Sequence, residues 1–310
     1  MILTVTLNAA VDKRYVIEGL KIGEVNRTIS TKNSAGGKGI NVARVCSLLG
    51  EKAIATGFVG GYSGQYIEDE TKKQGIKSEF CHVDGESRSC INIYDKITAI
   101  QTEVLEGGIK VTSKDETTFK ELYTKLVDEC KIVVISGSVP SGSSLTIYNE
   151  LVEIAKQKNK KVIVDTSKDY LKRVVEVKPT MIKPNTDEIA QLVGKENLSK
   201  AEVIEAAKEL HQGGIEIVAV SLGKDGSIVV YENEVYEVII PPVKTVNSVG
   251  CGDSMIAGFA TGLNRELPIE EIIKLASASG TSNALSEETG YVELGQVNEL
   301  IKQVKIVKKS

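Results

Sequence analysis

Short runs rich in valine and isoleucine alternate along this chain with longer amphipathic stretches, and this alternation constrains the fold most. The strand-like runs span 53–59, 132–136, 162–165 and 215–222, each bounded by glycine, proline or polar residues. Continuous apolar runs of this length are typical of buried parallel strands. Helical patterns occupy 64–75, 115–129, 145–157, 200–212 and 269–286. This order predicts an α/β fold, a three-layer αβα sandwich around a mostly parallel central sheet.

Two regions lack helical pattern and instead resemble strand pairs, residues 14–19 with 27–33 and residues 88–95 with 102–106. We expect them to form a small β-sheet lid whose base faces a ligand cleft. An isolated small sheet leaves edges and an apolar face to cover, which favours a homodimer through the lid. With no internal repeat or low-complexity linker, the chain is expected to be a single domain, 1–310, with lid strands near 14–33 and 88–106.

Composition narrows the classes of partner. The formal net charge is −4, which argues against a nucleic-acid binder because such proteins carry a basic surface. No apolar run approaches the ~20 residues that cross a bilayer, so no membrane partner is expected. The five cysteines are scattered without a paired spacing, and the N-terminus has no basic leader. These features predict a reduced, cytoplasmic protein.

A second strong signal is the sequence Gly250-Cys251-Gly252-Asp253 ahead of a small-residue helical stretch. Helix N-termini expose unpaired N–H groups and favour negative charge. Glycines let an anion approach those groups because they lack a Cβ atom. The motif therefore predicts a site for a transferring phosphoryl group, with Asp253 as general base for an attacking hydroxyl. The simpler alternative is that Asp253 only caps the helix.

A glycine-rich segment, Gly36-Gly37-Lys38-Gly39, precedes Asn41 and an apolar helical stretch. The spacing differs from that of a P-loop. It still offers close backbone approach, a positive charge and an amide side chain, a combination that suits a phosphorylated sugar. The alternative is a glycine-rich turn from strand to helix with a surface lysine.

Three further segments place polar residues near strand ends. Asp12 follows the N-terminal strand, where it lines the ligand crevice or serves as a loop acid. Asn185 and Glu188 form a capping-box pattern, and the same oxygens can orient waters around Mg²⁺. The segment 221–226 is a glycine turn whose simplest interpretation is a hairpin loop.

Cys251 offers a different chemistry, because a thiol at a helix N-terminus can become a nucleophile. A cysteine hydrolase needs a histidine partner, and the chain contains only His82 and His211. Neither lies in a recognisable catalytic pattern, so the anion-binding interpretation is favoured.

With both glycine motifs present, the chain resembles the ribokinase-like (PfkB) carbohydrate kinases from end to end. Within that family it is similar to the sugar-phosphate branch, the tagatose-6-phosphate kinases and 1-phosphofructokinases. The likeness to this branch is carried by residues 4–8, 26–27, 88–91, 102–106 and 289–292. The resemblance implies a ribokinase-like fold, ATP and Mg²⁺ as cofactors, and a sugar phosphate as the second substrate.

The resemblance also implies a role for each candidate residue. Asp253 would be the base, and the amides of Gly250, Cys251 and Gly252 would hold the phosphoryl group in transit. The sugar hydroxyls would be bound by Asp12, Gly37 and Asn41, and the existing phosphate by Lys38 and Arg88. The nucleotide side would comprise Lys183, Asn185, Ser221, Gly223, Gly226 and Asn283, with Asn185 and Glu188 meeting Mg²⁺ through water.

The acceptor is expected to be tagatose 6-phosphate, phosphorylated on C1, because Cys90 and the lid segment with Glu103 look more like the tagatose type. The alternative is 1-phosphofructokinase activity, in which fructose 1-phosphate is phosphorylated on C6. A non-catalytic sugar-phosphate sensor is a distant alternative, disfavoured because Asp253 is present. Two departures from the family pattern are Cys251, where alanine is frequent, and Asn247-Ser248, which puts a monovalent-cation site in doubt.

Overall fold

The computed structural model describes residues 1–309, and it confirms the expected mostly parallel sheet. The strand order is β15-β14-β13-β12-β11-β10-β9-β1-β4-β5, with β6 beside β4. Strands β12 to β5 in this order run parallel, and β13, β14 and β15 extend one edge antiparallel. The bounds are β1 (Ile2–Thr6), β4 (Ala53–Val59), β5 (Lys77–Ser78), β6 (Cys81–His82), β9 (Ile132–Ser136), β10 (Lys161–Asp165), β11 (Met181–Ile182), β12 (Ile217–Ser221), β13 (Ser227–Tyr231), β14 (Glu234–Ile239) and β15 (Lys305–Lys309).

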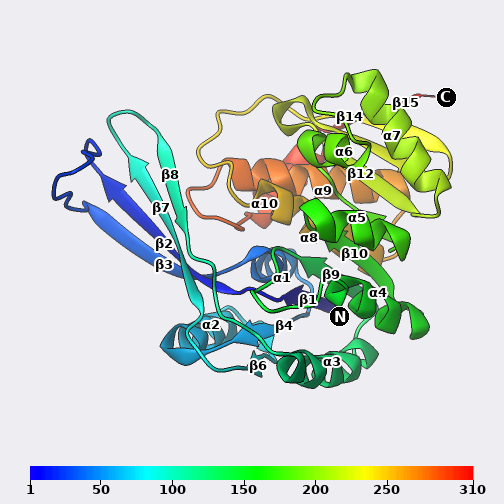
Figure 1. Ribbon diagram of the computed structural model, residues 1–310. Helices are drawn as coiled ribbons and strands as arrows, with labels where there is room; N and C mark the ends of the chain where they lie inside the picture. Colours follow the sequence, from blue (N-terminus) through cyan, green and yellow to red (C-terminus); the bar gives the residue numbers. More distant parts are fainter. Residues whose placement is uncertain (310) are drawn as a thin grey trace.

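Helices cover both faces of this sheet and complete the three layers (Figure 1). One face packs against α1 (Lys38–Leu48), α2 (Gly61–Lys73), α8 (Cys251–Asn264), α9 (Ile269–Ala284) and α10 (Leu294–Ile301). The other packs against α3 (Ser113–Asp128), α4 (Ile147–Gln157), α5 (Lys168–Glu176), α6 (Thr186–Leu192) and α7 (Lys200–Gln212). Strand side chains are buried towards both layers, which explains the unbroken apolar runs in the sequence.

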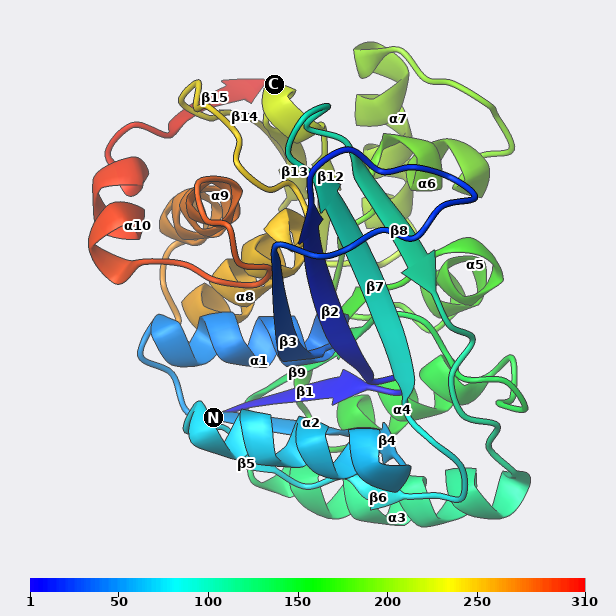
Figure 2. The ribbon, with the colours of Figure 1, turned by 90° about the vertical axis from the view of Figure 1, so that its left-hand side faces the viewer.

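The expected lid is present as a second sheet of four strands, in the order β3-β2-β7-β8. It stands away from the body in Figure 1 and faces the viewer in Figure 2. Its strands are β2 (Ala10–Ile17), β3 (Ser30–Gly36), β7 (Arg88–Asp95) and β8 (Gln101–Leu105). The two predicted hairpins are joined by parallel pairing of β2 with β7. Strand β2 begins four residues earlier than predicted, because Ala10 already pairs with Gly36 and Arg88.

Two glycines fix how α1 starts at the junction of the two sheets. Gly37 caps the helix with φ of 104°, a conformation that strains any residue with a Cβ atom. A Cβ on Gly39 would lie 2.3 Å from Thr6 Oγ1 and 2.6 Å from the carbonyl of Val5. The glycine-rich segment therefore lets α1 pack directly on β1 and brings its first turn to the carboxyl end of the sheet.

None of the helices within residues 1–309 is both long enough and apolar enough to cross a membrane.

Candidate active site

A cavity of about 900 Å³ lies between the carboxyl ends of the central strands and the lid. Ligands of open parallel sheets bind at this edge because the helix N-termini and loops converge there. Of the candidate site residues, those that line it are Asp12, Gly37, Lys38, Asn41, Arg88, Cys90, Glu103, Lys183, Asn185, Ser221, Gly250, Gly252 and Asp253. The structure thus brings together residues more than two hundred positions apart in the sequence.

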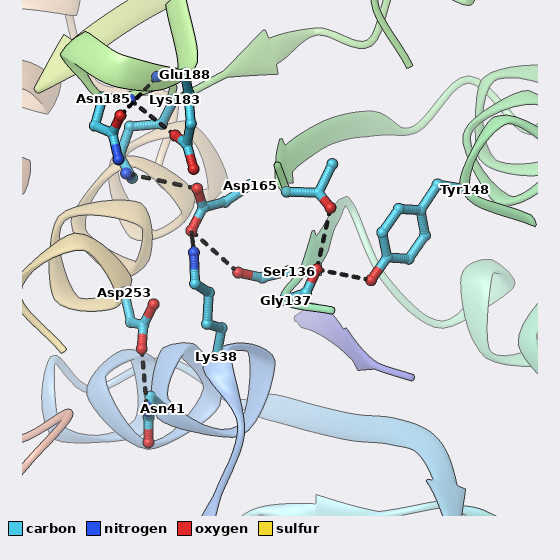
Figure 3. Close-up of polar contacts among 11 residues, drawn as sticks. Lys38, Asn41, Ser136, Gly137, Tyr148, Asp165, Lys183, Asn185, Glu188 and Asp253 are labelled. Atoms are coloured by element: carbon cyan, nitrogen blue, oxygen red, sulfur yellow. Dashed lines mark hydrogen bonds and ion pairs between the residues drawn. The ribbon is translucent and has the colours of Figure 1, made fainter. Parts of the chain in front are cut away.

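One end of the cavity holds four charged side chains, Lys38, Asp165, Lys183 and Asp253, which we call the transfer cluster. Asp165 ends β10, is 2% exposed, and lies 3.2 Å from Lys38 Nζ and 3.5 Å from Lys183 Nζ (Figure 3). Burial raises the pKa of Asp165, but the two ammonium groups outweigh it and the net shift is downward. Asp165 also raises the pKa of Lys38. The cluster therefore holds two fixed positive charges beside Asp253.

Asp253 lies in the first turn of α8 and is 6% exposed. Its Oδ2 accepts a 2.8 Å hydrogen bond from Asn41 Nδ2 on α1 (Figure 3). Burial raises the pKa of Asp253, opposed first by the charge of Lys38. A carboxylate with a raised pKa, at the wall of a cavity, suits a general base.

Glycines shape residues 247–252, the loop and first residues of α8, here called the anion loop after its predicted role. Gly250 is left-handed, with φ of 85°, and a Cβ there would lie 2.6 Å from the amide nitrogen of Gly290. Lys183 approaches the same loop, because a Cβ on Gly252 would meet its Nζ at 3.4 Å. The first-turn amides of α8 have no intrahelical acceptor. These amides and the Lys183 ammonium group therefore place hydrogen-bond donors and a positive charge at one point of the cavity wall.

Cys251 and Asn283 lie behind this loop rather than in front of it. Asn283 is fully buried and donates to the carbonyl of Val249 at 2.9 Å and to Cys251 Sγ at 3.3 Å. The expected contact of Asn283 with adenine does not fit this burial, and its amide instead braces the anion loop. Burial also raises the pKa of the Cys251 thiol, which argues against a nucleophilic cysteine.

The lid end of the cavity has a different character. Asp12 and Cys90 lie side by side on β2 and β7, and Glu103 lies on the next strand, β8. Burial raises the pKa of Asp12 to about 6, opposed mainly by the charge of Arg44. Arg88 donates to the carbonyl of Asn8 at 3.2 Å. These groups place carboxylates and hydrogen-bond donors at the lid end of the cavity wall.

Lys38 and Arg88, expected together on the substrate's phosphate, have different neighbours in the structure. Lys38 pairs with Asp165 in the transfer cluster, whereas Arg88 contacts Asn8 and Ser138 at the base of the lid. Asn41 also differs from expectation, since both heteroatoms of its amide are engaged, by Asp253 and by Arg44. Lys38 therefore lies at the Asp253 end of the cavity and Arg88 at the base of the lid, and the Asn41 amide is held between Asp253 and Arg44.

On the nucleotide side, Asn185 caps α6, and the predicted capping box with Glu188 is confirmed, with bonds of 2.8 and 2.9 Å. Ser221 ends β12 and lies beside Asn185. Gly223 and Gly226 form the turn between β12 and β13, as the hairpin interpretation expected. A Cβ on Gly226 would lie 1.9 Å from the carbonyl of Val238, so packing against β14 accounts for this glycine.

Comparisons with known proteins agree with this geometry. The model of the "pfkB family carbohydrate kinase" matches residues 3–293. A tagatose-6-phosphate kinase of Staphylococcus epidermidis is 40% identical over 310 residues, which is 99% of each chain. The chain belongs to the pfkB family of carbohydrate kinases.

Solved structures of the pfkB kinases carry the same fold. The structure of a possible 1-phosphofructokinase from Thermotoga maritima superposes with a TM-score of 0.91 at 30% identity, covering 100% of both chains. The tetrameric inhibited form of phosphofructokinase-2 from Escherichia coli gives a TM-score of 0.89 at 25% identity, covering 97% of this chain and 98% of that one. The expected ribokinase-like architecture of this sugar kinase is therefore confirmed.

Three site features of this pfkB kinase were missed from its sequence. Asp165 ends the parallel strand β10, so the strand-end argument that was applied to Asp12 would have identified it. Arg44 is a buried cation one helical turn after Asn41. Residues 286–291, here called the strap, contact the lid through the Lys32–Glu288 ion pair and the anion loop through Asn247. Such a tertiary connection leaves no local pattern in the sequence.

Proposed function

We propose that this pfkB kinase transfers the γ-phosphoryl group of ATP to C1 of tagatose 6-phosphate and releases ADP and tagatose 1,6-bisphosphate. The single observation that carries the proposal is the position of Asp253 at the cavity wall, beside Lys38 and the glycine loop of α8. A hydroxyl placed there has a base for its proton and an anion site for the phosphoryl group. The tagatose acceptor is inferred from the staphylococcal relative.

The transfer step follows from these groups. Asp253 Oδ1 takes the proton of the C1 hydroxyl as the C1 oxygen bonds to the γ-phosphorus and the bond to the β,γ-bridging oxygen breaks. Lys38, Lys183 and the first-turn amides of α8 stabilise the charge that spreads over the equatorial oxygens. Arg88, with Ser138 nearby, is proposed to hold the phosphate at C6, away from the transfer cluster.

Magnesium is proposed to act with ATP, neutralising the charge of the phosphate groups. Within residues 1–309 no three carboxylate, histidine or cysteine side chains gather as a metal cluster. Glu188 Oε2 accepts a hydrogen bond from the backbone N–H of Asn185, which leaves Oε1 for a water-mediated contact with Mg²⁺. This donor set fits a hydrated Mg²⁺ held mainly by substrate phosphates.

The lid is proposed to form a homodimer. On the lid face away from the cavity lie Tyr15, Ile93 and Val104, the last 51% exposed. The related phosphofructokinase-2 forms a tetramer. Sedimentation of wild type and of Val104→Lys tests this proposal, because a charge in a buried interface would dissociate the dimer. A wild type that sediments as a monomer at micromolar concentration contradicts the proposal. The cytoplasmic location remains a proposal, supported by the five free thiols.

The deciding experiment measures ADP release from MgATP with tagatose 6-phosphate, fructose 1-phosphate and fructose 6-phosphate in parallel. The highest kcat/KM with tagatose 6-phosphate supports the proposal. A preference for fructose 1-phosphate assigns the alternative, 1-phosphofructokinase, which the similarity to the Thermotoga maritima structure also fits. No turnover with any ketohexose phosphate rejects the proposed substrate class.

A further inference from the structure

Arg44 is a buried cation that has no carboxylate at ion-pair distance within residues 1–309, and no step of the proposed reaction uses it. It is 8% exposed and lies three residues after Asn41 on α1, so the two side chains share one helix face. Within residues 1–309 its partners are uncharged oxygens, namely Asn41 Oδ1, Gln74 Oε1 and the carbonyls of Ala35 and Thr289. Burial lowers the pKa of Arg44, and the carboxylates that oppose this effect, Asp12 first, lie beyond ion-pair distance. A buried charge without a direct ion pair is costly, so this position calls for a role that a neutral side chain does not fill.

The hydrogen bonds of Asn41 supply that role. Its Oδ1 accepts from Arg44 Nη1 at 2.9 Å, and its Nδ2 donates to Asp253 Oδ2 at 2.8 Å. A guanidinium is only a donor, so it must face the acceptor side of the amide. The donor side then points at Asp253. Figure 3 shows one Asp253 oxygen on Asn41 and the other directed away from it.

We propose that Arg44 is a positioning residue for the transfer step, because it locks the Asn41 amide so that Nδ2 occupies Asp253 Oδ2 and Oδ1 is left to take the proton. The inference rests on the proposed function, in which Asp253 is the base. Without Arg44 the amide is free to turn over and present its oxygen to Asp253. That orientation suits only a protonated carboxyl group, which cannot act as a base.

The same guanidinium joins three other parts of the site. It binds the carbonyl of Ala35 on β3, the strand that pairs with the Asp12 strand, and the carbonyl of Thr289 in the strap at 3.2 Å. Its charge also lowers the pKa of Asp12, against the effect of burial. The planar guanidinium of Arg44 thus links Asp253 (through Asn41), the environment of Asp12 and the strap.

A titration tests this without any substrate. In full-length protein with ¹³C-carboxyl-labelled aspartate, the Asp253 resonance is assigned by its loss in Asp253→Asn. We expect the pKa of Asp253 to rise by about 1 in Arg44→Met, because the amide is no longer locked and a positive charge is lost. The matched control is Arg265→Met, since Arg265 binds the carbonyl of Leu49 and Glu51 away from the cavity. An Asp253 pKa unchanged in Arg44→Met, or raised equally in Arg265→Met, overturns the proposal.

Kinetics give a second readout. Arg44→Met is expected to lower kcat about 10- to 100-fold, and to lower it little further when Asn41 is already leucine, because the effect passes through Asn41. If the kcat loss of the double variant equals the product of the losses in Arg44→Met and Asn41→Leu, the proposal is overturned.

A variant that retains the charge covers the case in which Arg44→Met does not fold. Arg44→Lys keeps a cation but loses the planar fork, in which three separate nitrogens reach the acceptors on Gln74, on Asn41 and Thr289, and on Ala35. We expect a kcat loss of about 3- to 10-fold and a raised Asp253 pKa, and wild-type values of both overturn the proposal. If wild type turns over no ketohexose phosphate, the proposed function fails, whereas the titration still decides the role of Arg44.

Discussion

The two ends of the cavity are built on opposite principles. In the transfer cluster every charged group has a buried, charged neighbour, as Asp165 does between two lysines. In the lid, polar side chains cross the sheet in rows, as Lys32, Arg14, Asn92 and Glu103 do, and Glu103 is exposed. Charges fixed around two buried carboxylates favour one chemical step. Exposed rows of polar side chains can adjust to a sugar. Substitutions at the transfer cluster are therefore expected to alter kcat, and those in the lid to alter KM.

The strongest test of this contrast is Asp253→Asn. Because the substitution removes the base but preserves size, we expect kcat to fall by about 10²- to 10⁴-fold with the KM for the sugar phosphate changed little. Steady-state kinetics and thermal unfolding of the same preparation measure both effects. Turnover near that of wild type contradicts the assignment of Asp253 as the base.

Asp165→Asn is expected to have the next largest effect. Removing the charge leaves Lys183, 6% exposed, without its carboxylate, and frees Lys38 to move. We expect a loss of about 3 kcal/mol in the free energy of unfolding and a fall in kcat of about 100-fold. Denaturant unfolding and kinetics measure these changes, and Lys195→Met, which breaks an exposed ion pair, is the control. Full activity in Asp165→Asn would show that the two lysines hold their positions unaided.

Asp12→Asn sharpens the comparison through pH. The folded protein raises the pKa of Asp12 from 3.8 to about 6, so the fold disfavours the ionised form. Its contribution to stability is complete below about pH 4 and is lost as the pH rises through 6. We therefore expect Asp12→Asn to be more stable than wild type at pH 8, by up to about 3 kcal/mol, and no more stable at pH 4.

The same variant is expected to bind the sugar phosphate less tightly at pH 8, because a carboxylate acceptor for hydroxyls is lost. Unfolding midpoints across this pH range and the KM for the sugar phosphate are the measurements. A stability difference that does not depend on pH contradicts the assigned cause.

The smallest effect is expected from Asp95→Asn at the tip of the lid. Asp95 accepts hydrogen bonds from the amides of Gly19, Leu20 and Ile97 and from the Thr98 hydroxyl, and these bonds lower its pKa to about 2. Its stabilising contribution is therefore present above pH 4 and is lost as the pH falls through 2.

At neutral pH we expect Asp95→Asn to change kcat less than 2-fold and to raise the KM for the sugar phosphate by about 3-fold, since the lid tip loosens. Hydrogen exchange at Gly19 and Leu20 reports the loosening directly. Faster exchange with an unchanged KM would mean that the tip moves independently of the rows of polar side chains across the lid.

The layers and the lid could be predicted because each depends on local pattern. Unbroken apolar runs gave the parallel strands, and the interval without helical pattern gave the lid hairpins. The glycine motif of the anion loop was identifiable from its position ahead of a helical stretch, and the left-handed conformation of Gly250 accounts for the first of its two glycines.

The neighbours of each polar side chain could not be predicted in the same way. The burial of Asn283 and the pairing of Lys38 with Asp165 depend on helices and strands far apart in sequence. The Arg44 network likewise joins α1, β3 and the strap. Residue type and spacing identify the candidate residues of a site, whereas the packing of helices and strands determines which of those residues contact one another.

The short link between the two sheets has a consequence for how this protein changes over generations. Only residues 7–9 separate β1 from β2, and all three are buried, so the lid is held against the body at a fixed hinge. The acceptor-facing rows nevertheless belong to a separate sheet whose far strand, β8, makes no pairing with the body. We therefore expect substitutions in β7 and β8 to change the preferred sugar during evolution without altering the residues proposed to transfer the phosphoryl group.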